Sequence, residues 1–111
     1  MSDKTFLGEF EQMVLLAILQ CGDQAYGPAV SAELEARAGR TVSRGALYSS
    51  LRRLEKKGRL RWHLEPPTPE RGGHPARRFQ VTESGLAALR LSRSALANLS
   101  AGLEHLIEGE S

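Results

Sequence analysis

The sequence predicts a mainly α-helical fold with a small β-hairpin, and three observations support this. Apolar residues recur at helical spacing in four stretches of the 111-residue chain, at 8–20, 28–38, 43–58 and 82–107. Residues 60–65 alternate apolar and polar side chains, and residues 76–81 place Phe79 and Val81 on one face, as in half-buried strands. Between them, PPTPERGGHP holds four of the five prolines and two adjacent glycines, which favours a loop.

Length and composition limit the possible class of protein. A chain of 111 residues, 41% hydrophobic and 25% charged, is expected to form one soluble globular domain. The sequence contains no run of 18 apolar residues, so we expect no membrane span. The stretch MSDKTFLGEF lacks the pattern of a signal peptide. The single cysteine, Cys21, excludes an internal disulfide and suits a reducing cytoplasm. We interpret Cys21 as a small residue at a helix end and not as a redox sensor.

Charge is distributed unevenly along the chain. Residues 40–78 contain eleven Lys or Arg against three Glu, a net charge of +8, whereas the remaining residues sum to −6. A basic centre between acidic ends is typical of a surface that binds a polyanion.

Residues 43–58, SRGALYSSLRRLEKKG, form the most informative predicted helix. Ser43 can cap its first turn, and Gly58 suits the left-handed residue that ends a helix. One stripe should face a core: Leu47, Leu51 and Leu54. The opposite face carries Gly45, Ser49, Arg52 and Lys56, with Arg53 beside them. Such a helix suits a DNA major groove, although an ordinary amphipathic helix with a solvated basic face has the same pattern.

The preceding segments predict a helix-turn-helix. Residues 8–20 are apolar on almost all sides, so we expect this helix to be covered on two faces, one of them by a second subunit. The turn DQAYG follows, and Pro28 suits the first position of the next helix, which Gly39 ends. Together with the third helix and the hairpin, whose Trp62 should face the core, this order predicts a winged helix-turn-helix domain over residues 1–82.

The last predicted helix begins after Thr82 and runs to about Ile107. Leu89, Leu96 and Leu103 lie seven residues apart, as do Ser92, Leu99 and Leu106. Because a monomer would leave this stripe in water, residues 83–111 are predicted to be a dimerisation helix. The predicted homodimer interface comprises Phe10, Leu15, Leu89, Leu96, Leu99, Leu103 and Leu106. Packing onto the first helix of the same chain is the alternative, and both can hold.

Three stretches together resemble the PadR family of bacterial winged-helix transcriptional regulators. They are the turn Tyr26–Gly27, the block GALYSSLRRLEKKGRL, and GGHPARRFQVTESG. The family's third helix commonly ends in leucine, two basic residues, leucine, glutamate and glycine, and its second wing strand leads into threonine-x-x-glycine. This chain has Gln80 where a second aromatic residue is usual. The single final helix resembles the subgroup with a short C-terminal region.

The resemblance implies a dimeric, cytoplasmic repressor that binds a pseudo-palindromic operator in double-stranded DNA. In some relatives it also implies release by a small molecule at the dimer interface. Relatives that stack flat drugs use aromatic residues of the final helix, and this chain has none between Glu83 and Ser111.

The residues predict particular DNA contacts. Arg52 is the first candidate for a guanine edge, with Ser49, Arg53 and Lys56 beside it, and Gly45 allows a close approach of the backbone. Phosphate contacts are assigned to Ser43, Arg44 and Tyr48 near the helix N-terminus. The wing would hold the DNA backbone or minor groove through Arg71, Arg77 and Arg78.

The sequence leaves two other classes of function open. A winged-helix module for protein–protein contact, with its basic face on an acidic partner, is the main alternative. An enzyme is a distant third, because the three histidines are scattered and no carboxylate pair has a catalytic spacing. His63 and His74 lack companions at ligand spacing, so we expect no metal and no cofactor.

Overall fold

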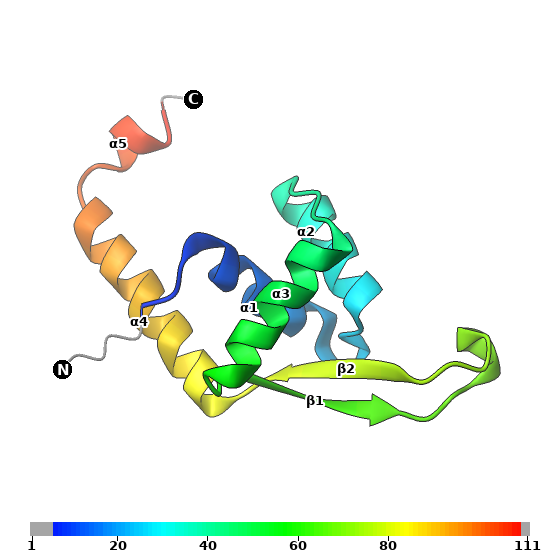
Figure 1. The fold of residues 1–111 in the computed structure, drawn as a ribbon. Helices are drawn as coiled ribbons and strands as arrows, with labels where there is room; N and C mark the ends of the chain where they lie inside the picture. Colours follow the sequence, from blue (N-terminus) through cyan, green and yellow to red (C-terminus); the bar gives the residue numbers. More distant parts are fainter. Residues whose placement is uncertain (1–5, 110–111) are drawn as a thin grey trace.

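A computed structural model describes residues 6–109. Residues 1–5, on which the expectation of no signal peptide partly rests, lie outside this range. The elements of the structure follow in the order α1 (Glu9–Cys21), a 3-10 turn (Gly22–Gln24), α2 (Gly27–Ala38), α3 (Arg44–Lys56), β1 (Leu60–Glu65), a 3-10 turn (Pro69–Arg71), β2 (Ala76–Val81), α4 (Glu83–Ser100) and α5 (Glu104–Ile107). Figure 1 shows the β1–β2 hairpin extending to one side of the helices and α4 lying on the other. The predicted fold class is confirmed.

Capping explains where the helices begin. The Ser43 hydroxyl accepts a hydrogen bond from the Ala46 amide at 3.1 Å, as its position before α3 predicted. α2 begins one residue earlier than expected, at Gly27, so that Pro28 occupies its second position. The missing N–H of a proline is still harmless there, because the first amides of a helix have no carbonyl partner within it.

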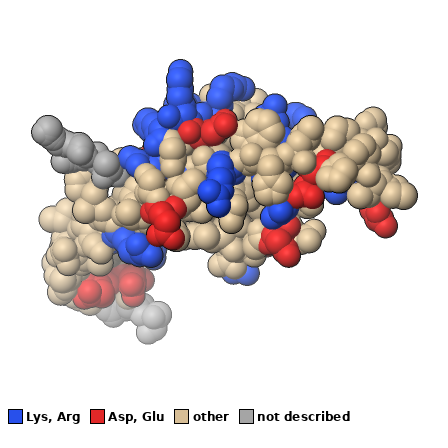
Figure 2. All heavy atoms as spheres, turned by 90° about the horizontal axis from the view of Figure 1, so that it is seen from below, with Lys and Arg blue, Asp and Glu red and all other residues tan. Residues whose placement is uncertain are grey.

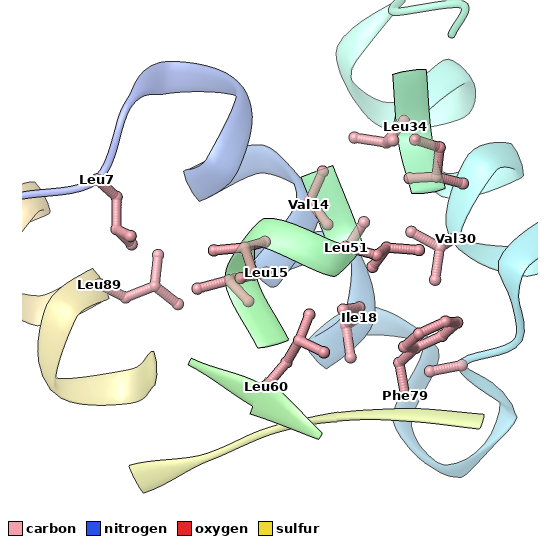
Figure 3. Packing of buried hydrophobic residues seen from close by; sticks show 14 of the residues in the cluster. Leu7, Val14, Leu15, Ile18, Val30, Leu34, Leu51, Leu60, Phe79 and Leu89 are labelled. Atoms are coloured by element: carbon pink, nitrogen blue, oxygen red, sulfur yellow. The ribbon is translucent and has the colours of Figure 1, made fainter. Parts of the chain in front are cut away.

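The core is built from every main element. Buried side chains of α1, α2 and α3 converge on Leu60 and Phe79 of the hairpin, and Leu89 of α4 closes one end against Leu7 (Figure 3). α1 lies at the centre, where Val14, Leu15 and Ile18 are buried. The expected two-sided cover of α1 is largely supplied by its own chain, through contacts with α2, α3, β2 and α4.

The hairpin pairs β1 and β2 antiparallel, from Leu60 opposite Val81 to Glu65 opposite Ala76. Phe79 also donates its amide to the Ala25 carbonyl at 2.8 Å, which fixes the turn before α2 against the hairpin. Leu60 is buried and Trp62 half-buried, but Leu64 is 59% exposed. The prediction that Leu64 would be covered is wrong, because the hairpin extends past the end of the core.

The C-terminal region is two helices and not one. α4 ends at Ser100, and Gly102 has a φ of 83°, a left-handed conformation that a helix does not contain. The predicted continuous helix to Ile107 is therefore wrong after residue 100. Leu103 and Leu106 lie beyond the break, so the heptad spacing does not align them with the leucines of α4.

Thr82 joins α3, the hairpin and α4 at one point. Its hydroxyl donates to the Gly58 carbonyl at 2.6 Å and accepts from the Gly85 amide at 3.0 Å, while its own amide donates to the Arg59 carbonyl. Gly85 is buried at this junction, and a Cβ added there would lie 2.1 Å from the Arg59 carbonyl oxygen. No side chain can be accommodated without a shift of the backbone.

Gly85→Ala is therefore expected to lower the free energy of unfolding by about 1–3 kcal/mol, the usual cost of overpacking. The matched control is Gly45→Ala, since a Cβ at Gly45 meets no atom within 4 Å and alanine favours a helix. The control should be neutral or stabilising by up to about 1 kcal/mol. Urea denaturation at one protein concentration measures both, and equal stabilities of the two variants would contradict the account of this junction.

Candidate nucleic-acid interface

α3 presents one buried and one exposed face. Leu47, Leu51 and Leu54 lie in the core, as predicted, and Ser50 is also buried. The exposed positions of the helix include Arg44, Gly45, Arg52, Arg53 and Lys56, whereas Ser49 is half-buried. Figure 2 shows Lys and Arg gathered along the upper edge of the surface viewed there, with fewer acidic side chains among them. The structure therefore leaves the basic face of α3 free.

Close packing of Tyr48 against the start of α2 sets the position of α3. A Cβ on Gly27 would lie 2.1 Å from the Tyr48 hydroxyl oxygen, so only glycine leaves room for this phenol. The Tyr48 ring also meets Phe79 of β2 edge-on, with centroids 6.2 Å apart. Tyr48 thus fixes α3 to both α2 and the hairpin.

A polar groove lies between the start of α2, the first half of α3 and the wing. Its lining includes Arg44, Tyr48 and Arg52 from α3, and Leu64 and Arg77 from the hairpin. Four residues predicted separately as DNA contacts, Arg44, Tyr48, Arg52 and Arg77, are thereby brought to one surface. Neither Arg52 nor Lys56 forms an ion pair with any residue in the range 6–109, so both charges face solvent.

Three of the predicted basic residues are instead held by neighbours in the chain. Arg53 donates to the hydroxyls of Ser49 and Ser50, at 3.2 and 3.0 Å. Arg71 stacks on Tyr26 and donates to the carbonyls of Pro66 and His74, which fastens the wing loop.

Arg78 is the third residue held in this way. It donates to Glu65 at 2.8 Å and lies 2.7 Å from His63 Nε2. The hairpin register explains this, because residues 61, 63 and 65 share a face with residues 76, 78 and 80, whereas Arg77 points to the other face with Trp62.

Glu65 was not identified from the sequence as part of this surface. The hydrogen bond from Arg78 lowers the pKa of the Glu65 carboxyl below its usual value, and partial burial opposes this; the Arg78 charge and a contact with His63 at 3.0 Å lower it further. Alternation along β1 places Glu65 on the polar face, but its pairing with Arg78 depends on the register, which the ten-residue loop does not define.

Cys21 is half-buried at the end of α1, and burial, followed by the negative charge of Glu33, raises the pKa of its thiol. A raised pKa disfavours the reactive thiolate, which supports the interpretation of Cys21 as a helix-end residue. Among residues 6–109 no cluster of His, Cys, Asp or Glu has the geometry of a metal site. Within the same range, no helix has the length and apolar character needed to cross a bilayer.

Comparison with known proteins agrees with this geometry. The model of the PadR-like family of transcriptional regulators matches residues 15–91, which is more than half of the chain and contains α2, α3 and the wing. The chain belongs to the PadR-like family. Members of this family are transcriptional regulators and not enzymes, as the sequence predicted.

Solved structures of PadR-like regulators have the same fold. A PadR family regulator from Eggerthella lenta is 28% identical, with a TM-score of 0.66 over 92% of this chain and 88% of that one. A PadR-like regulator from Bacillus cereus is 24% identical, with a TM-score of 0.68 over 91% and 93% of the two chains. Comparison with curated proteins finds no match.

The Glu65–Arg78 pair predicts a pH-dependent effect. Because the folded pKa of Glu65 is lowered, the pair stabilises the fold above the unfolded pKa of Glu65, and this contribution is lost as the pH falls through the folded value. Arg78→Ala should raise the pKa of Glu65 toward its ordinary value, measured by NMR titration of the side-chain carboxyl. Arg77→Ala, on the opposite face of β2, should leave it unchanged; an equal rise in both variants would refute the pairing.

Proposed function

We propose that this PadR-like regulator binds double-stranded DNA sequence-specifically and acts as a dimeric repressor at a pseudo-palindromic operator. The observation that carries the proposal is the groove where the exposed face of α3 meets the wing, with Arg44, Arg52 and Arg77 around it. Guanidinium groups bind both phosphates and the O6 and N7 edge of guanine. A B-DNA major groove is wide enough for an α-helix, so α3 could enter it while the wing beside it contacts the adjacent backbone.

Each element has a distinct role in the proposed complex. Arg52, at an exposed central position of α3, contacts a base edge, with Ser49 and Lys56 on either side. Gly45 lets the helix backbone approach the DNA, since no atom lies over its α-carbon. The N-terminal part of α3 contacts a phosphate through Ser43, Arg44 and Tyr48, where the helix dipole and the amides of the first turn favour an anion.

In the wing we assign the main DNA contact to Arg77. Its neighbour Arg78 is ion-paired with Glu65, and Arg71 donates its hydrogen bonds to carbonyls of the wing loop. Arg53 keeps a secondary role, because Ser49 and Ser50 already bind its guanidinium. Among the basic residues of the predicted contacts, these assignments favour Arg44, Arg52, Lys56 and Arg77, whose side chains form no hydrogen bond or ion pair with any residue between 6 and 109.

The dimer is proposed to form through the C-terminal segment, residues 83–111. Four leucines of the predicted interface are exposed in the isolated chain: Leu96, Leu99 (78% exposed), Leu103 and Leu106. Phe10 lies half-buried on α1, under the Arg40 guanidinium. Leu15 and Leu89, by contrast, are buried in the core of their own chain and cannot contact a partner, so we remove both from the predicted interface. Two copies of α3 about 34–36 Å apart would occupy successive major grooves of one duplex.

We assign no effector. The C-terminal segment of the proposed interface lacks the aromatic residues on which flat molecules stack, because no Phe, Trp or Tyr occurs between Glu83 and Ser111.

DNA binding is tested with a sequence selected in vitro from a random library and with unselected duplex. Arg52→Ala should weaken binding to the selected sequence by about 1–3 kcal/mol and have a smaller effect on unselected DNA. Fluorescence anisotropy at several salt concentrations measures both, and wild-type binding should weaken steeply with salt as counterions are released. Equal losses on the two duplexes would make Arg52 a phosphate contact. Failure of the wild type to bind DNA would favour a protein-interaction module instead.

Dimerisation is tested by replacing the exposed leucines of α4. The double variant Leu96→Ala, Leu99→Ala should shift the protein from dimer to monomer. It removes apolar side-chain area that is exposed in the monomer and that the proposed dimer would bury. Sedimentation equilibrium measures the mass. Leu64→Ala is the control, since Leu64 is exposed to the same extent as Leu96 but lies on the wing. A dimer of unchanged affinity in the double variant would place the interface elsewhere.

A further inference from the structure

Two of the arginines that line the groove, Arg77 and Arg44, each lie on an aromatic ring. The Arg77 guanidinium carbon is 4.4 Å from the centroid of Trp62, and that of Arg44 is 5.2 Å from the centroid of Tyr48. Both distances are within the range of a cation–π interaction, which is strongest on tryptophan. The two arginines belong to different elements, one to the wing and one to α3.

Three aromatic side chains, Trp62, Phe79 and Tyr48, line one small cleft together with Arg77. Trp62 lies opposite Phe79 in the hairpin register, and Phe79 meets Tyr48 at an interplanar angle of 63°. Phe79 is buried, and Trp62 and Tyr48 are half-buried. Trp62 and Tyr48 are therefore partly covered by the protein, and each still has an arginine over its ring.

Register explains why Arg77 reaches Trp62. On a pleated hairpin, residues diagonal to one another on the same face are close enough for long side chains to touch. Arg77 is diagonal to Trp62 on the face that also carries Phe79, and it lines the same small cleft as Arg52. Arg78 points to the opposite face and is paired with Glu65, which leaves Arg77 as the arginine of β2 beside α3.

We propose that Trp62 is a positioning residue for DNA binding, which holds the Arg77 guanidinium beside α3 before the DNA arrives. A free arginine loses side-chain entropy when it binds, and this loss weakens the complex. An arginine already stacked on a rigid ring has lost part of that freedom in the unbound protein. The inference rests on the proposed DNA binding, but the contact between Trp62 and Arg77 is tested without DNA.

Trp62 is the only tryptophan of the chain, so its fluorescence reports the contact directly. In the free protein, Arg77→Ala should raise the rate at which acrylamide quenches Trp62, because it uncovers one face of the ring. Arg78→Ala should leave quenching unchanged, since Arg78 lies on the other face of the hairpin. Unchanged quenching in Arg77→Ala would overturn the proposal, and this measurement retains the native ring.

DNA binding then tests the consequence, with a fluorescein-labelled 30-base-pair duplex of mixed sequence. Trp62→Leu should weaken binding about two- to fivefold, the effect of an exposed cation–π contact, and keep the salt dependence, because no charge is lost. Trp62→Phe, which retains an aromatic face, should restore part of the loss. Arg77→Ala should weaken binding and lower the slope of log affinity against log salt by about 0.9.

The double variant Trp62→Leu, Arg77→Ala decides between positioning and a purely structural role. If Trp62 acts through Arg77, the double variant binds no more weakly than Arg77→Ala alone. If Trp62→Leu weakens binding by the same factor in both backgrounds, the ring only supports the fold and the proposal is overturned. Circular dichroism and thermal unfolding accompany each variant. A wild type that binds no DNA would refute the proposed function, whereas binding without coupling would refute this inference alone.

Discussion

The burial of one face of α3 is the constraint on which the surface depends. Leu47, Leu51 and Leu54 occupy the core with α1 and the hairpin, so rotation of α3 about its axis would expose leucine and bury arginine. Both changes are costly, since a buried guanidinium needs a partner and exposed leucine side chains lose their transfer free energy. The direction in which Arg52 and Lys56 point is therefore determined by hydrophobic packing on the opposite side of the same helix.

Much of this arrangement can be predicted from residue spacing. The first three helices and the start of α4 were correctly located because their apolar periodicity and two of their caps, Ser43 and Thr82, are local signals. The strands were placed to the residue because the proline- and glycine-rich loop bounds them on one side. The outward face of α3 followed from the same leucine spacing, and the basic residues assigned to it are exposed, with Ser49 half-buried.

Predictions failed where tertiary contacts override local pattern. The alternation in β1 identified a strand and placed Leu64 on its buried face. It could not show that the hairpin extends beyond the core, where Leu64 is exposed. Heptad spacing in the last segment continued through Gly102, although α4 ends at Ser100 and Gly102 adopts a left-handed conformation. Adjacent residues of a strand face opposite sides, so Arg77 and Arg78 point in different directions. Their partners, Trp62 for Arg77 and Glu65 for Arg78, depend in addition on the register of the hairpin. Spacing within one segment cannot give the alignment of two segments.

Ser92 gives α4 a second attachment, far along the helix from Thr82. Its buried hydroxyl accepts the Leu7 amide at 2.8 Å, and Ala88 and Leu89 pack into the core beside it. The first half of α4 is therefore a rigid arm of the winged domain, while the leucines near its far end project into solvent. In a dimer joined by those leucines, any twist of one arm against the other turns the attached α3 with it. In the proposed complex, the packing of these leucines would therefore set the distance between the two copies of α3, although the leucines do not line the groove themselves.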